Sequence, residues 1–186
     1  EERFPGIDGV GFIAWVPRAT LKEFIATTRA DKTPDFTVRE SGLTNDLFVI
    51  KYIEPEVRHQ ALLGLDVWGD PEQRAVAERA RDTGLAALSR TITLEVEGRG
   101  PQRGCLMLLP VYRHGMPTDT KAERQAAIEG WVFARFITAQ LMLEVIGGNQ
   151  PGLHLRIFDT DTPGPDNLVF DEDPKLTATR PWDQAL

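Results

Sequence analysis

A single carboxylate, Asp66, lies inside the otherwise apolar stretch LLGLDVW at residues 62–68. In an extended chain successive side chains point to opposite faces, so Asp66 would share a face with Gly64 and Trp68. A carboxylate in such a place costs free energy unless it is solvated or hydrogen-bonded. The sequence therefore predicts that Asp66 has hydrogen-bond donors of its own.

The residue types leave two interpretations of Asp66 open. A short acid before a turn commonly accepts hydrogen bonds from nearby backbone amides. Alternatively, Asp66 accepts hydrogen bonds from an amine or amide of a ligand in a mostly apolar cavity. The tryptophans Trp15, Trp68 and Trp131 are expected mainly in the core, with one or two of them lining such a cavity and stacking on a planar ligand. Tyr112 could add a hydroxyl to the same cavity.

Catalytic and metal-binding patterns do not appear in the sequence. There is no G-x-S-x-G, Walker loop or paired-cysteine motif. The three histidines lack ligand spacing and the acids near the C-terminus form an ordinary solvated run, so we expect no metal and no cofactor. A small hydrolase using Asp66 as general base is the alternative function, but no serine or cysteine is placed as its nucleophile.

Composition limits the class of protein. The 186 residues, 41% of them hydrophobic, suit one domain or one and a part. A net charge of −7 argues against binding to nucleic acid. The single cysteine, Cys105, lies in an apolar run and is expected to be a buried, inert thiol. No stretch approaches the length of a membrane span, and the start of the chain, EERFPG, looks like a cut inside a longer protein.

Hydrophobic periodicity predicts an α+β fold with a mixed antiparallel sheet and helices on one side of it. The predicted strands are residues 10–16, 36–40, 47–55, 87–96, 105–113 and 130–136, with another from 153. The predicted helices are 21–29, 71–82 and 137–148, with a helical turn near 122–129 and loops at 56–60 and 97–104. For the second helix, Asp70 is the expected cap, Pro71 the first residue, Gln73 the capping partner and Gly84 the stop.

Six blocks of this sequence resemble successive blocks of the CHASE domain, an extracytoplasmic sensory module of histidine kinases, diguanylate cyclases, nucleotide cyclases and plant cytokinin receptors. The blocks are GVGFIAWVPR, VIKYIEP, LGLDVWGDPEQRAVAERARDTG, LSRTITL, LMLLPVYR and GWVFARF. The resemblance covers residues 4–159, and the block from Asp66 to Leu88 is its most specific part.

The resemblance implies a ligand site. The plant members use a carboxylate at the place of Asp66 to hydrogen-bond an adenine edge, and the backbone of a leucine matching Leu88 for a second bond. With the aromatic residues above, the predicted ligand-binding residues are Asp66, Leu88, Trp68, Tyr112 and Trp131. The fold implied is PAS-like: residues 1–140 would form the membrane-distal ligand-binding unit, and residues 141–186 a linking helix and the start of a partial, membrane-proximal PAS-like unit.

The function implied is a non-enzymatic sensor of a small, planar, nitrogen-bearing molecule. The parent would be a sensor histidine kinase or diguanylate cyclase of the inner membrane, with this domain in the periplasm or outside the cell. We expect the parent to be a homodimer, this chain alone to be a monomer or weak dimer, and contact with the membrane to occur only through flanking helices that this chain lacks.

Overall fold

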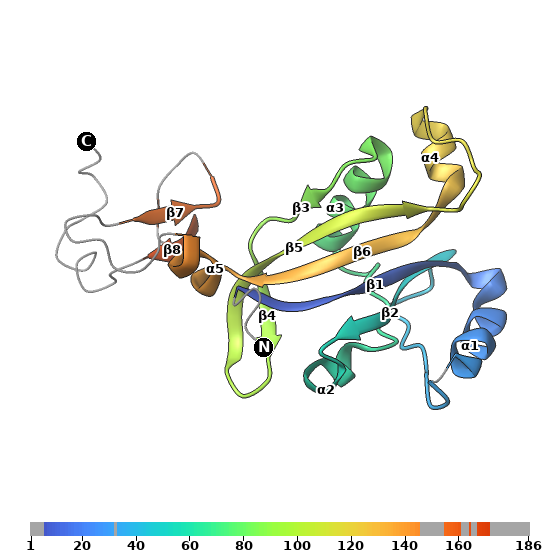
Figure 1. The fold of residues 1–186 in the computed structure, drawn as a ribbon, viewed down its shortest axis with the longest axis horizontal. Helices are drawn as coiled ribbons and strands as arrows, with labels where there is room; N and C mark the ends of the chain where they lie inside the picture. The colour runs from blue at the N-terminus through green and yellow to red at the C-terminus, as the bar shows by residue number, and fades with distance from the viewer. Residues whose placement is uncertain (1–5, 32, 146–154, 161–163, 165–166, 172–186) are drawn as a thin grey trace. The chain divides into compact units, whose positions relative to one another are not determined.

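The computed structural model describes residues 6–31, 33–145, 155–160, 164 and 167–171 and has an α+β fold (Figure 1). Contacts divide the chain into two compact units. The main unit comprises Gly9–Ser89 and Leu106–Arg135, and the minor unit comprises Glu1–Asp8, Arg90–Cys105 and Phe136–Leu186. The boundary near residue 140 and the second PAS-like unit stay predictions.

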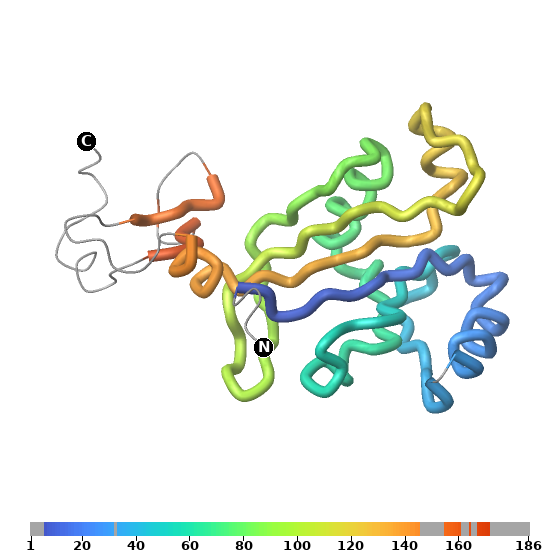
Figure 2. Tube along the Cα trace, viewed as in Figure 1, coloured from blue at the N-terminus to red at the C-terminus, as the bar shows by residue number. Residues whose placement is uncertain are grey.

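A six-stranded sheet carries the fold, in the order β2-β1-β6-β5-β3 with β4 paired to β5. The strands are β1 (Ile7–Pro17), β2 (Asp46–Glu54), β3 (Ala87–Leu88), β4 (Ile92–Val96), β5 (Gly100–Tyr112) and β6 (Ile128–Ile137). Figure 2 shows the first strand, in blue, running beside the orange sixth strand, although more than a hundred residues separate them. The predicted placement of residues 105–113 and 130–136 in one sheet is confirmed.

The pairing of β1 with β2 is antiparallel and is set by apolar residues. It runs from Val10 opposite Glu54 to Pro17 opposite Asp46, with an irregularity between Phe12 and Ile13. Pro17 ends β1 because it has no amide proton to continue the ladder. One buried cluster joins both strands to the loop before β2: Ala14, Val16, Phe36, Leu47 and Val49.

The helices agree with the predicted ones where local signals are strong. They are α1 (Leu21–Ala30), α2 (Glu56–His59), α3 (Pro71–Thr83), α4 (Lys121–Ala127) and α5 (Thr138–Val145). Asp70 caps α3 by accepting hydrogen bonds from the amides of Glu72 and Gln73 at 2.9 and 3.3 Å. Gly84 ends α3 with a φ of 74°, a left-handed conformation that favours glycine.

Three predicted boundaries are wrong, and hydrogen bonds to distant residues explain two of them. Residues 36–40 make only an isolated bridge, because Arg39 binds the backbone of Gly64 and Asp66 instead of a strand. The strand expected over 87–96 is broken at Ser89, whose hydroxyl, rather than a backbone carbonyl, accepts the hydrogen bond of the Leu106 amide at 2.9 Å. The hairpin loop expected at 97–104 is shorter, since β5 already begins at Gly100.

Short helices occur in two segments for which the sequence predicts a loop or a single helical turn. Residues 56–60, expected as a loop, form α2 and the first residue of the 3-10 turn Gln60–Leu62. The helical turn expected near 122–129 is α4, which begins one residue earlier at Lys121 behind a capping box of Thr120 and Glu123. The helix expected to reach residue 148 is α5, and its predicted end lies outside the described residues.

The minor unit contains a two-stranded antiparallel sheet of β7 (Arg156–Phe158) and β8 (Leu168–Asp171). The predicted start of β7 at residue 153 lies outside the described residues. Cys105 is half-buried rather than buried. Burial, and secondarily the charge of Asp159, raise the pKa of its thiol, so Cys105 stays protonated at neutral pH as expected of an inert cysteine.

Candidate functional site

Asp66 is fully buried, at 2% exposure, and the chain itself supplies its hydrogen-bond donors. Its Oδ1 accepts hydrogen bonds from the amides of Phe48, at 2.9 Å, and Trp68, at 3.1 Å. Its Oδ2 accepts hydrogen bonds from the amide and hydroxyl of Ser41, at 3.2 and 2.7 Å. A carboxylate offers about four lone-pair positions, so these donors satisfy it in the absence of a ligand.

The stretch around Asp66 is not a strand but is held between two neighbours by isolated bridges. Leu65 bridges Arg39 in parallel, and Asp66 bridges Val49 of β2 in the antiparallel sense. The amide of Asp66 donates to the carbonyl of Arg39 at 3.0 Å, and the amide of Val67 donates to the carbonyl of Phe48 at 2.9 Å. The carboxylate thereby joins β2, the residue 41 loop and the N-terminal approach to α3.

An aromatic cluster lies beside Asp66 and consists of Trp15, Phe48, Trp68 and Trp131. The Phe48 ring stacks on Trp68 with 3.9 Å between centroids and on Trp131 with 4.6 Å, each at an interplanar angle of 19°. Phe48 and Trp131 are buried, while Trp15 and Trp68 are half-buried. Two of the residues that stack here also give their backbone amides to Asp66, so the carboxylate and the rings form one site.

Helix α3 covers this aromatic cluster. The indole nitrogen of Trp131 donates a hydrogen bond to the carbonyl of Ala77 on α3 at 3.0 Å. The guanidinium carbons of Arg74 and Arg81, also on α3, lie 5.3 Å from the Trp68 ring centroid and 5.5 Å from that of Trp15. The rings therefore meet cations from the helix as well as one another.

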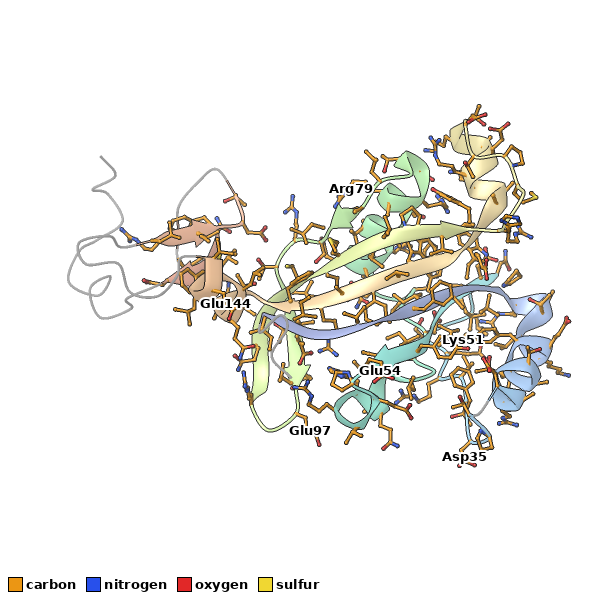
Figure 3. The ribbon with its side chains drawn as sticks, in the orientation of Figure 1. Asp35, Lys51, Glu54, Arg79, Glu97 and Glu144 are labelled. Carbon is orange, nitrogen blue, oxygen red and sulfur yellow. The ribbon has the colours of Figure 1, made fainter. Side chains whose placement is uncertain are left out.

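Leu88 lies on the short strand β3, opposite Met107 of β5, and its side chain is exposed. Its carbonyl accepts a hydrogen bond from Nη2 of Arg79 at 2.5 Å. Figure 3 shows Arg79 on α3 close to β3. The backbone of Leu88, the predicted second contact for a ligand, is thus held by the same helix that covers the aromatic cluster.

Tyr112 lies at the end of β5 and contacts the C-terminal end of α3. Its hydroxyl donates a hydrogen bond to the carbonyl of Arg81 at 2.7 Å. Burial is the main cause that raises the pKa of this phenol. The structure therefore brings Asp66, Trp68 and Trp131 together, whereas Tyr112 and Leu88 meet α3 through Arg81 and Arg79.

The C-terminal end of α3 is fixed by the carboxylate of Asp82. It accepts hydrogen bonds from Nε of Arg81 at 2.7 Å and the side-chain amide of Gln125 at 3.0 Å, and it pairs with Nζ of Lys121 at 2.8 Å. Arg124 also donates two hydrogen bonds to the Asp82 carbonyl, at 3.0 and 2.8 Å. Three of these partners lie on α4, so α4 anchors the helix that covers the site.

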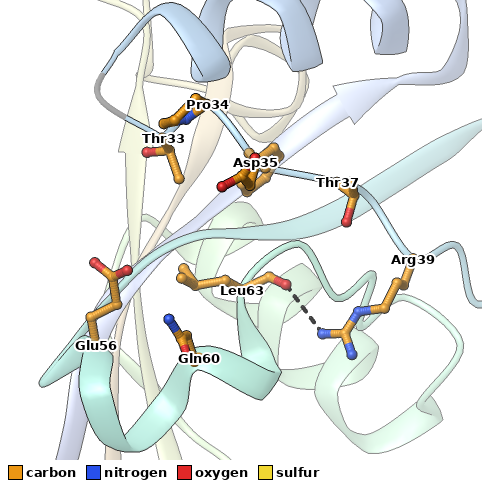
Figure 4. Close-up of a pocket in the computed structure, with 9 residues that line it drawn as sticks. Thr33, Pro34, Asp35, Thr37, Arg39, Glu56, Gln60 and Leu63 are labelled. Atoms are coloured by element: carbon orange, nitrogen blue, oxygen red, sulfur yellow. Dashed lines mark hydrogen bonds between the residues drawn. The ribbon is translucent and has the colours of Figure 1, made fainter.

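A separate groove of about 490 Å³ lies on the surface of the main unit (Figure 4). It is lined by Thr33, Pro34, Asp35, Phe36, Thr37, Arg39, Glu56, Gln60 and Leu63. Arg39 spans it by donating hydrogen bonds to the carbonyls of Leu63, at 3.1 Å, and Ala61. None of the residues predicted to bind a ligand lines this groove.

The described ranges hold neither a metal-binding group of side chains nor a membrane-spanning helix. There, no three His, Cys, Asp or Glu side chains are grouped so that they could hold a metal ion. Among the same residues, no helix is long and apolar enough to span a lipid bilayer.

Sequence reasoning missed Ser41, Phe48 and Arg81 as members of this site. Ser41 carried no signal, because its partner Asp66 is 25 residues away and only the fold brings them together. Phe48 was visible only as one of several strand aromatics. Arg81 belongs to the charge-rich helix α3 and is only 8% exposed. The position of Arg135 late in a predicted strand favours a solvated or ion-paired side chain, but this residue is also buried.

Comparison with known proteins identifies the family of this chain. The profile of the CHASE domain matches residues 1–170. Over 100 residues, which are 52% of this chain, the sequence is 35% identical to a probable histidine kinase 4 of Oryza sativa subsp. japonica, and the match spans 10% of that protein. CHASE domains are extracytoplasmic sensory domains that bind small molecules. With its profile matched over most of the chain, this protein belongs to the CHASE domain family.

Proposed function

We propose that this CHASE domain binds a small planar molecule between Asp66 and the aromatic cluster, and that binding is the signal it senses. The observation that carries the proposal is the buried Asp66 carboxylate, whose amide donors Phe48 and Trp68 are also the stacked rings. A hydrogen-bond acceptor beside flat apolar surfaces suits a nitrogen heterocycle, which can donate an N–H group and stack.

The two oxygens of Asp66 would have different roles in binding. Oδ1 is held by two backbone amides that belong to β2 and to the approach to α3, so it fixes the carboxylate. Oδ2 is held only by Ser41, in a loop whose residues 41–43 are exposed. A ligand N–H group would replace the Ser41 hydroxyl on Oδ2, with the half-exposed Trp68 ring moving aside to admit the ring of the ligand.

Leu88 would supply the second polar contact from its backbone, and Tyr112 would act through the end of α3 that it contacts. Arg79 of α3 donates a hydrogen bond to the Leu88 carbonyl, and the Arg81 carbonyl of α3 accepts one from the Tyr112 hydroxyl. A shift of α3 on ligand binding would therefore also move Leu88 and Tyr112. Such a shift is the kind of two-state change by which a sensor reports occupancy.

The wider setting is also part of the proposal. The sheet order β2-β1-β6-β5-β3, with helices packed on it, supports a PAS-like unit. We propose that the parent protein is an inner-membrane homodimer, with this domain on the periplasmic or outer side and a histidine kinase or diguanylate cyclase as output. The similarity to a plant histidine kinase favours the first of these outputs.

A melting screen of the chain against small metabolites and nitrogen heterocycles tests the proposal. A sensor is stabilised by its ligand through mass action and returns the ligand chemically unchanged. Recovery of an unaltered compound by mass spectrometry, together with a higher melting temperature, is the expected result. Conversion of the compound would favour the alternative of a hydrolase, and the absence of stabilisation by any class of small molecule would contradict the proposal.

A further inference from the structure

Arg81 places a nearly buried cation against the aromatic cluster. The residue is 8% exposed, and its guanidinium carbon lies 5.5 Å from the Trp15 ring centroid. Its Nε donates to Asp82 at 2.7 Å. Within the part of the chain that the structure describes, neither of its η nitrogens donates a hydrogen bond to a protein acceptor. A guanidinium has five N–H donors, so Arg81 retains most of its capacity to bind an anion.

The carboxylate that binds Arg81 also pairs with a second cation. The carboxylate of Asp82 is shared between Arg81, at 2.7 Å, and Lys121, at 2.8 Å, so two cations face one anion. The nearby guanidinium of Arg124 binds carbonyl oxygens of Asp82, Thr118 and Asp119 rather than a carboxylate. Asp82 therefore neutralises Arg81 only in part, because Lys121 pairs with the same carboxylate.

From this arrangement we infer that the sensed molecule carries a carboxylate. The η nitrogens of Arg81 bind this carboxylate, while the ring of the ligand stacks in the aromatic cluster. The inference rests on the proposed function and narrows its ligand class. Asp66 would accept a hydrogen bond from a ring N–H group, and Arg81 would bind the carboxylate. The ligand would thus be a planar nitrogen heterocycle with a donor and a carboxylate on it. Paired N–H donors of arginine match a carboxylate in geometry as well as charge.

Matched pairs of compounds test this inference directly. The probes are the carboxylate and the neutral carboxamide of indole, benzimidazole and purine, whose rings each carry an N–H donor, measured by melting and calorimetry on the whole chain. Within each ring type that binds, we expect the carboxylate to bind about tenfold to a hundredfold more tightly than its carboxamide, because it gains charged hydrogen bonds.

Three variants assign that preference to Arg81. Arg81→Gln should bind a carboxylate and its carboxamide with similar affinity, and Arg81→Lys, which keeps the charge but lacks the fork of donors, should keep part of the preference. Arg58→Gln, at an exposed position of α2, loses the same charge and should behave like the wild type. A cooperative melting transition of each unliganded variant establishes that it folds. If Arg81→Gln does not fold, the comparison uses Arg81→Lys instead.

The outcomes separate this inference from the function on which it rests. The assignment of Arg81 would be overturned if carboxamides bound as tightly as their carboxylates, or if Arg81→Gln still preferred the carboxylate. The proposed function would stand in either case, and the first result would indicate that the sensor does not require an anionic ligand. If no ring of either kind binds and the wider metabolite screen is also negative, the proposed function itself fails, and this inference fails with it.

Discussion

Ser41 binds one oxygen of Asp66 twice, through its amide at 3.2 Å and its hydroxyl at 2.7 Å, across 25 residues of sequence. The Ser41 hydroxyl also accepts a hydrogen bond from the amide of Gly69 at 3.1 Å. Replacing the hydrogen of Gly69 with a methyl group would place that carbon 2.9 Å from the Ser41 side chain, so the two segments are in close contact. The loop at Ser41 therefore closes over the Asp66 carboxylate.

Asp66→Asn should lower both stability and binding. The new amide group presents donors where the chain already supplies donors, so at least one buried hydrogen bond is lost, at a cost of about 1–3 kcal/mol in the free energy of unfolding. Affinity for a ligand found in the melting screen should fall about tenfold to a hundredfold. Asp70→Asn is the control, because asparagine caps a helix as well as aspartate does. Urea unfolding and calorimetry measure the two effects, and unchanged affinity in Asp66→Asn would contradict the ligand role.

Ser41→Ala should separate the roles of the two Asp66 oxygens. The empty protein loses the hydroxyl bond to Oδ2 and should unfold about 1 kcal/mol more easily. A ligand that competes with that hydroxyl should bind several-fold more tightly to this variant, since less is displaced. The control is Thr28→Ala, which removes a hydroxyl hydrogen bond to the Phe24 carbonyl within α1. Weaker binding to Ser41→Ala than to Thr28→Ala would show that the ligand does not displace Ser41.

The substitutions Trp131→Phe and Trp68→Phe, at the two ends of the aromatic cluster, should differ in their effects on stability and on ligand affinity. Trp131 is fully buried and donates to the Ala77 carbonyl, so Trp131→Phe loses both packing and a hydrogen bond, about 2 kcal/mol or more in the free energy of unfolding. Trp68 is half-buried, and among the described residues its indole nitrogen makes no such bond, so Trp68→Phe should cost less stability and act mainly on ligand affinity. Paired urea titrations and calorimetry measure both, and equal losses of stability would refute this division.

Asp82 should stabilise the protein at neutral pH and lose that effect in acid. Burial raises the pKa of its carboxyl, but hydrogen bonds from Arg81, Lys121 and Gln125 outweigh burial and hold the pKa below its usual value of 3.8. A lowered folded-state pKa gives stability that is present above 3.8 and is lost as the pH falls through the folded-state value. The difference in unfolding free energy between the wild type and Asp82→Asn should therefore shrink below pH 3.8. The exposed Asp35→Asn should show little difference at any pH, and an Asp82 difference independent of pH would contradict the assignment.

The sequence predicts elements well where their signals are local. Asp70, Pro71 and Gly84 mark both ends of α3 within a few residues, and the structure confirms all three. Pro17 likewise ends β1 as expected. Such signals act through the backbone of their own neighbourhood, so no knowledge of the fold is needed to interpret them.

The parts that could not be predicted depend on contacts between distant residues. The donors of Asp66 come from Phe48 and Ser41 as well as from the adjacent Trp68, and their approach follows only from the sheet. The break at Ser89 is of the same kind, because its cause is the hydrogen bond to Leu106. Alternating hydrophobicity continues through Ser89 and therefore predicts one strand where there are two.

The most direct test of the central claim follows the indole N–H signals of the protein by NMR during titration with a ligand from the melting screen. The four tryptophans are assigned through single Trp→Phe variants. A ligand that enters between Asp66 and the aromatic cluster should shift the signals of Trp15, Trp68 and Trp131 in proportion to occupancy. Saturation with those three signals unmoved, and with the amides of Thr37 and Arg39 in the surface groove shifting instead, would contradict the claim.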